Sequence, residues 1–140
     1  MALPEAIAVG AAGAAGALSR YGLDQWLHRR YPRASTGPIL TVNITGSLLL
    51  GLVVGLVLFH DAPAELRTVA GTGFCASYTT FSTAMYETAT LLRQRLWAAA
   101  VRHAGITLIA SCLAAAAGLI ASGAIADAAG LGTRLTLEVA

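Results

Sequence analysis

The residues with the clearest chemical potential form a cluster of hydroxyl side chains inside an otherwise apolar segment. The cluster is the run Ala76-Ser77-Tyr78-Thr79-Thr80-Phe81-Ser82-Thr83. Hydrocarbon offers a hydroxyl group no hydrogen-bond partner, so these side chains must face protein, water or a passing solute. The cluster therefore predicts a permeation site within a membrane-spanning segment.

The same cluster predicts a break in the helix that carries it. Successive small and β-branched polar residues beside an aromatic residue favour a local interruption over a continuous helix. A break exposes backbone carbonyls, which can hold a cation, and it directs Phe81 and the hydroxyl groups towards a cavity.

Polar residues on two other apolar segments are candidates for the same cavity. Asn43 brings two donors and one acceptor into an apolar region, where each of them needs a partner. Thr107 and Ser111 are four residues apart and share one helix face, which His103 extends by one turn. Structural roles remain open for all of them: Asn43 can join two helices, and each hydroxyl can bond the carbonyl one turn back.

Two charged residues lie near the predicted site. Arg20, near the end of the first apolar segment, is costly if it faces lipid; it either extends its charge to the interface or places positive charge at a vestibule. Glu87 lies about one turn beyond the last residue of the hydroxyl cluster and either caps a polar cavity or pairs with an arginine. No nucleophile and base, metal-ligand cluster or phosphate-binding loop occurs at a recognisable spacing, so we do not expect an enzyme.

Composition places the chain in a lipid bilayer. It has 140 residues, of which 56% are hydrophobic and 11% charged, and its mean hydropathy is +0.69, which is too apolar for a soluble domain of this size. The net charge of +2 comes from nine arginines near the ends of apolar segments, so nucleic acid is not an expected partner. Cys75 and Cys112 lie in apolar segments and are interpreted as small hydrophobes.

Four apolar segments are long enough to cross about 30 Å of hydrocarbon. They cover approximately residues 4–26, 38–59, 64–92 and 96–120, and the third contains the hydroxyl cluster. The first lacks the basic region and cleavage site of a signal peptide, so we expect it to be retained. Its Gly10, Gly13 and Gly16 predict close helix packing, and the Ala/Gly-rich tail after the fourth is expected to fray. The predicted fold is an all-α membrane protein with one domain of four transmembrane helices.

The arginines predict one orientation in the membrane. Short connections place the loops after the first and third segments on the same side. Two arginines, Arg67 and Arg134, fall on the side of the termini, and seven fall on the side of those loops: Arg20, Arg29, Arg30, Arg33, Arg93, Arg95 and Arg102. The positive-inside rule then predicts a multi-pass protein of the cell membrane with both termini outside.

Motifs on the first three segments resemble those of the CrcB/Fluc fluoride channels. The matching residues are Gly13-x-x-Gly16-x-x-x-Arg20-Tyr21, Asn43-x-x-Gly46-Ser47-x-x-x-Gly51 and Gly73-Phe74-Cys75-x-x-x-Thr79-Thr80-Phe81-Ser82-Thr83-x-x-x-Glu87. The resemblance extends over all four segments, and its most specific part is the run from Thr79 to Thr83.

This resemblance implies a passive, fluoride-selective exporter that protects the cell against fluoride. It implies an antiparallel dimer with double-barrelled pores at the subunit interface and a structural sodium ion at its centre. Arg20 matches a vestibule residue, and the carbonyls of Ala76 and Thr79 match the positions that hold sodium. The implied fluoride pore contains Asn43, Phe81, Thr80, Ser82, Thr83, Thr107 and Ser111.

Four positions depart from the pattern of the family. Ala84 replaces a second pore phenylalanine, Ala76-Ser77 replaces a glycine pair, Ile39 replaces a threonine, and His103 replaces an aromatic residue. Together with the arginine bias, these departures predict one half of a heterodimer with an oppositely inserted paralog, while a homodimer remains open.

Two further alternatives remain. One is a non-conducting subunit that stabilises a channel partner. The other is a small multidrug-type transporter. The second alternative requires a carboxylate in the middle of the first helix, where this sequence has only glycine and alanine, with Glu5 at the very end.

Overall fold

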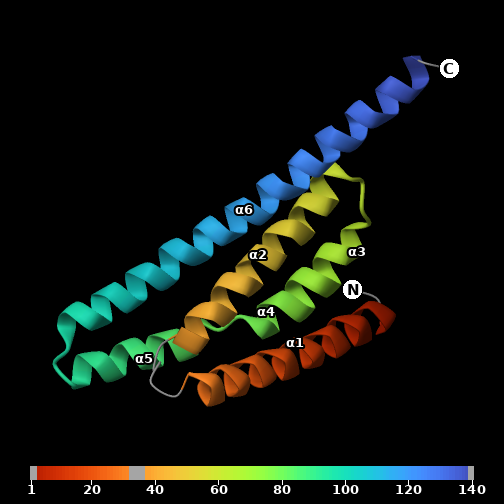
Figure 1. Ribbon diagram of the computed structural model, residues 1–140. Coiled ribbons are helices and arrows are strands. Elements are labelled where there is room, and N and C mark those ends of the chain that lie inside the picture. The colour runs from red at the N-terminus through yellow and green to blue at the C-terminus, as the bar shows by residue number, and fades with distance from the viewer. Residues whose placement is uncertain (1–2, 32–36, 139–140) are drawn as a thin grey trace.

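The computed structural model describes residues 3–31 and 37–138, and the described residues form helices without any strand (Figure 1). Three helices are continuous: α1 (Leu3–Arg30), α2 (Gly37–Phe59) and α6 (Trp97–Glu138). The segment predicted over 64–92 is divided into four pieces, namely α3 (Ala64–Leu66), the π-helical η1 (Arg67–Cys75), α4 (Ala76–Tyr78) and α5 (Phe81–Arg93).

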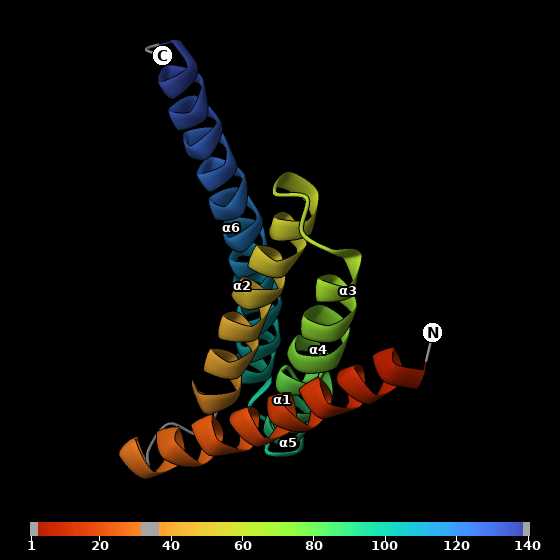
Figure 2. The ribbon, with the colours of Figure 1, turned by 90° about the vertical axis from the view of Figure 1, so that its right-hand side faces the viewer.

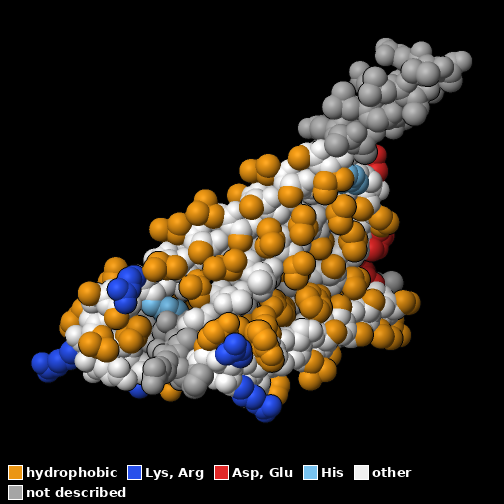
Figure 3. Space-filling model, in the orientation of Figure 1, with side chains coloured by type: hydrophobic (Ala, Val, Ile, Leu, Met, Phe, Trp, Pro, Cys, Tyr) orange, Lys and Arg blue, Asp and Glu red, His pale blue; other side chains and the backbone are white. Residues whose placement is uncertain are grey.

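Two of these helices are long and apolar enough to cross a membrane. They are α2 and the part of α6 that spans Trp97–Ile125. Among the described residues, α1 and the pieces α3 to α5 do not meet the same measure of length and hydropathy. Glycines and the polar residues Glu5, Ser19 and Arg20 lower the hydropathy of α1, and the break shortens the pieces between α2 and α6. Hydrophobic side chains nevertheless cover much of the visible surface (Figure 3).

The last helix differs most from its predicted bounds. Instead of fraying after residue 120, α6 continues to Glu138 and projects beyond the other helices (Figure 1). The tail is rich in alanine, which has the highest intrinsic helix propensity. Helix α1 likewise continues past residue 26, to Arg30.

Glycines allow the helices to approach closely at two places. Between α2 and α6, a Cβ atom at Gly51 would meet the carbonyl oxygen of Ala115. Between α1 and η1, a Cβ atom at Gly16 would meet the carbonyl of Phe74, whereas one at Gly10 would meet nothing within 4 Å. The glycine face predicted on α1 is therefore used for packing at Gly16 but not at Gly10.

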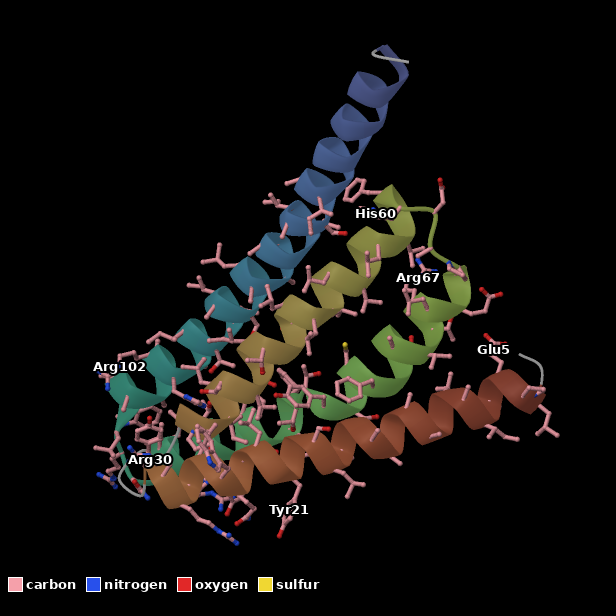
Figure 4. All side chains as sticks on the ribbon, turned by 45° about the vertical axis from the view of Figure 1, so that its right-hand side comes forward. Glu5, Tyr21, Arg30, His60, Arg67 and Arg102 are labelled. Carbon is pink, nitrogen blue, oxygen red and sulfur yellow. The ribbon has the colours of Figure 1, made fainter. Side chains whose placement is uncertain are left out.

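The helices form two packed groups around the break. Helix α6 lies along α2 and also contacts α5, while α1 crosses η1 and α4 (Figures 1 and 2). His60 lies at the end of α2, and its Nε2 is 2.8 Å from the carbonyl oxygen of Ser122 on α6. Arg30 and Arg102 lie at one end of the molecule, whereas Arg67 and Glu5 lie at the other (Figure 4). This arrangement agrees with the alternating path inferred from the sequence.

Candidate functional site

The predicted helix break lies between α4 and α5. Thr79 (φ −75°, ψ 160°) and Thr80 (φ −148°, ψ 116°) have extended backbones, and Phe81 is the first residue of α5. The Oγ1 atom of Thr80 accepts a hydrogen bond from the backbone N–H of Thr83 at 3.2 Å and so caps α5. The chain thus turns from one short helix to the next within two residues.

Asn43 joins α2 to this break through both polar ends of its amide. Its Nδ2 donates to the carbonyl of Thr80 at 3.0 Å, and its Oδ1 accepts from the Thr80 N–H at 2.8 Å. Both residues are buried, with 7% and 9% of their surface exposed. Asn43 therefore has the interhelical role that its residue type allowed, and it contacts backbone atoms of the break.

Tyr78 fixes the end of α4 on the other side of the break. Its hydroxyl lies 2.9 Å from Oγ1 of Thr45 on α2, and its ring stacks on Phe74 with centroids 5.8 Å apart. Gly46 faces both Tyr78 and Thr79, and a Cβ atom there would collide with them. The break is thus held against α2 by packing as well as by hydrogen bonds.

A cavity of about 260 Å³ lies where α2, the break and α6 meet. It brings together five of the predicted pore residues, and it adds others that sequence reasoning did not select. Ser47 was detectable, because it lies one turn beyond Asn43 on α2. The lining residues are Asn43, Ser47, Leu50, Thr79, Thr80, Phe81, Ala84, Met85, Ala104, Thr107, Leu108 and Ser111.

The hydroxyl groups of Thr107 and Ser111 differ from those of five threonines elsewhere in the described residues. Both oxygens are buried and have no hydrogen-bond partner among the described residues. In contrast, five threonine hydroxyls donate to the carbonyl four residues earlier: Thr41, Thr45, Thr79, Thr88 and Thr90. The bond to the previous turn, which was the structural alternative for Thr107 and Ser111, is thus not made, and their donors are available to a solute in the cavity.

Phe81 is the aromatic residue of the cavity lining, and most of its surface is exposed. It lines the cavity, yet 77% of its surface is exposed, whereas Ala84, one turn later, is 2% exposed. Within this chain, the cavity therefore has an aromatic wall at Phe81, whereas Ala84 contributes only a small side chain.

Two predicted pore residues, Ser82 and Thr83, and the predicted vestibule residue Arg20 are not part of the cavity lining. The side-chain oxygens of Ser82 and Thr83 are 3.3 Å and 3.0 Å from Oγ1 of Thr80, so they belong to the hydrogen-bonded cap of α5. Arg20 is half-buried on α1, and its Nε has no hydrogen-bond partner in the described part of the chain. Their roles in a pore and vestibule stay predictions.

Glu87 and His103 form a contact between α5 and α6 that the sequence did not predict. Oε2 of Glu87 lies 3.3 Å from Nε2 of His103, and the two side chains are 17% and 6% exposed. The side chain within ion-pair distance of Glu87 is thus a histidine and not the arginine considered from the sequence, and the two atoms do not meet hydrogen-bond geometry. His103 lies one turn before Thr107, so the pair adjoins the polar face of α6.

The break also removes the helical partners of two carbonyl groups. The Thr80 N–H, which would bond the carbonyl of Ala76 in a continuous helix, donates to Asn43. The Thr83 N–H, which would bond the carbonyl of Thr79, donates to the Thr80 hydroxyl. Uncharged carbonyl oxygens suit a hard cation, whereas no side-chain cluster suited to a metal occurs among the described residues. The backbone here therefore fits a sodium ion in its donor chemistry.

The chain matches one protein family and many of its curated members. A family model described as "CrcB-like protein, Camphor Resistance (CrcB)" matches residues 7–119. The "Fluoride-specific ion channel FluC 1" of Leifsonia xyli is 46% identical over 95 residues, which cover 68% of this chain and 69% of the relative. The "Fluoride-specific ion channel FluC" of Pseudomonas fluorescens Pf-5 is 36% identical over 118 residues, which cover 84% and 95%. The extent of these matches shows that the chain belongs to the CrcB family.

Proposed function

We propose that the protein is a subunit of a fluoride-selective ion channel that exports fluoride passively and protects the cell against fluoride toxicity. The observation that carries this function is the pair of unpartnered hydroxyls, Thr107 and Ser111, in the cavity that Asn43 and Phe81 also line. Hydroxyl and amide groups donate hydrogen bonds to an anion. The relatives named as fluoride-specific channels support the choice of ion.

The lining of the cavity is suited to conduction rather than to tight binding. None of its lining residues carries a formal charge, so an anion meets neutral donors that it can leave again. The low dielectric of the site strengthens each of these hydrogen bonds relative to water. The ring edge of Phe81, which carries partial positive charge, adds an apolar surface that favours a dehydrated anion.

The finer architecture that we propose is a four-helix membrane subunit in an antiparallel dimer with double-barrelled pores. It is supported by Ala76, an exposed residue whose carbonyl has lost its helical partner. Such a carbonyl is costly in hydrocarbon, so it needs a partner from a second chain or an ion. The carbonyls of Ala76 and Thr79 would hold a structural sodium ion, which when bound supplies positive charge at the dimer centre.

The second chain that we favour is an oppositely inserted paralog rather than a second copy. The support is the bias of seven arginines against two, which favours one orientation with both termini outside. A chain that inserts in one direction does not readily supply both halves of an antiparallel dimer. The one-sided aromatic wall, with Phe81 present and Ala84 small, is consistent with a pore completed by another chain.

Fluoride efflux from liposomes tests the function and the assembly together. Liposomes that contain this protein with an oppositely inserted paralog should release fluoride, measured with a fluoride electrode, and should retain chloride. Liposomes that contain this protein alone should release little fluoride, and rapid release from them would contradict the heterodimer. If efflux from the mixed liposomes is unchanged in Phe81→Ala and Thr107→Val variants, this chain is a non-conducting scaffold for its partner.

A further inference from the structure

We propose that Asn43 is the positioning residue that holds the helix break open, because its amide takes the N–H that Thr80 would give to Ala76 in a continuous helix and also bonds the Thr80 carbonyl. This role deepens the proposed channel function, since the break forms one wall of the fluoride cavity. It concerns the shape of the backbone, so it is separate from any contact between Asn43 and the ion.

The geometry sets two acceptors in competition for one donor. In a continuous helix the Thr80 N–H would bond the carbonyl of Ala76, four residues earlier. In this structure Oδ1 of Asn43 takes that N–H at 2.8 Å, and Nδ2 of Asn43 donates to the Thr80 carbonyl at 3.0 Å. One side chain on α2 therefore stabilises the extended backbone of Thr80 at the expense of the helix.

Burial makes this competition decisive. Asn43 and Thr80 are both almost fully buried, so the Thr80 N–H is shielded from bulk water. An unpaired buried N–H is costly. Without the Asn43 amide, the partner that restores the bond is the Ala76 carbonyl, and restoring it extends α4 towards α5.

Three features of the site depend on the backbone of Thr80. Its extended conformation leaves the carbonyl of Ala76 free, places its Oγ1 as the cap of α5, and sets the direction in which Phe81 begins that helix. Closing the break would change all three together, so it would alter the cavity wall and the proposed sodium ligands at once.

The amide is already engaged before an ion enters. Its Oδ1 accepts the Thr80 N–H and one hydrogen of Nδ2 is given to the Thr80 carbonyl, which leaves one Nδ2 hydrogen for the cavity. If Asn43 only bound the ion, only this remaining Nδ2 hydrogen would be required. The positioning role needs the other two bonds, and the two roles therefore predict different results for the backbone.

Solid-state NMR of the full chain in lipid bilayers, with its paralog present where the dimer requires it, tests the backbone directly. The Cα and Cβ shifts of Thr80 distinguish extended from helical backbone. We expect Asn43→Leu, which removes both amide bonds, to move them to helical values. We expect Asn43→Asp, which keeps an oxygen acceptor for the Thr80 N–H, to leave them extended. Thr41→Val is the matched control, because the Thr41 hydroxyl bonds only its own helix.

Extended Thr80 shifts in Asn43→Leu, or helical shifts in Asn43→Asp, would overturn the positioning role. If the leucine variant does not fold, the Thr80 shifts of Asn43→Ala are measured instead, and helical values are again expected. Fluoride efflux is measured on the same samples, and we expect a loss of at least tenfold in Asn43→Leu and no change in Thr41→Val. If the wild-type protein releases no fluoride even with its paralog present, the proposed function is refuted. The positioning role is still tested in that case, because the NMR shifts do not depend on fluoride.

Discussion

Thr107 and Ser111 illustrate how a hydroxyl side chain, which is common in membrane helices, becomes available to bind a solute. A threonine in a membrane helix usually satisfies its hydroxyl by bonding its own backbone, and Thr90 does so at 2.8 Å. Thr107 and Ser111 do not, although both oxygens are buried. A buried hydroxyl without a partner carries a desolvation cost, which a solute in the cavity offsets when it accepts the hydrogen bond.

Removing one of these hydroxyls should reduce conduction without harming the fold. In Thr107→Val we expect fluoride efflux to fall about 10- to 100-fold, because a hydrogen bond to a charged group contributes about 1.5–3 kcal/mol. The measurement is electrode-detected efflux from liposomes of the assembled channel. Thr90→Val is the control and should conduct normally, and equal losses in both variants would contradict the special role of Thr107.

The contact between Glu87 and His103 should couple α5 to α6 energetically. We expect a double-mutant cycle with Glu87→Gln and His103→Leu to give a coupling energy of about 0.5–3 kcal/mol in the free energy of unfolding, since the side chains are in direct contact. Denaturant unfolding in detergent micelles measures it. A cycle between Glu87 and His60, which binds α6 elsewhere, should give a value near zero, and similar values in both cycles would show that the contact is not specific.

At the scale of the elements, the central feature is a helix that is interrupted where it faces a cavity. Propensity alone weakens a helix through Thr79 and Thr80, but the extended backbone needs partners for its polar groups. Asn43 on α2 bonds both the N–H and the carbonyl of Thr80, and the Thr80 hydroxyl caps the first turn of α5. Close packing of α1 on η1 then fixes the segment that precedes the break.

The contact between α1 and η1 predicts opposite effects for two glycines on the same helix. Gly16→Ala should destabilise the fold by about 1–3 kcal/mol, because the new methyl group overlaps the carbonyl of Phe74. Gly10→Ala should be neutral or stabilise by up to about 1 kcal/mol, since nothing lies within 4 Å and alanine favours the helix. Thermal unfolding in detergent compares them, and a stable Gly16→Ala variant would contradict the close approach.

At the scale of the whole molecule, positive charge is concentrated at one end. Arg30 and Arg102 lie there, and Arg67 lies at the opposite end (Figure 4). The distribution of arginines along the sequence thus becomes, in the folded protein, a difference in positive charge between two faces of a membrane protein. That difference favours a single orientation.

Reducing this charge difference should produce both orientations. Replacing four arginines with glutamine, Arg29, Arg30, Arg93 and Arg95, leaves three on their side against two on the other, where the natural chain has seven against two. We expect reporters fused to the C-terminus to change from one location to two. Arg67→Gln, which increases the bias, should keep a single location, and a single location for the fourfold variant would show that charge does not set the orientation.

The sequence by itself determined the helical class, the position of the break and five of the twelve residues that line the cavity. These features follow from the length of the apolar segments and from the cost of polar groups within them, which are both local properties. Only the tertiary structure decided that Asn43 bonds the backbone of Thr80, that Glu87 meets His103, and that Thr107 and Ser111 lack partners. These contacts join residues far apart in the chain, and their formation depends on how α2, α5 and α6 pack, which no spacing within one segment specifies.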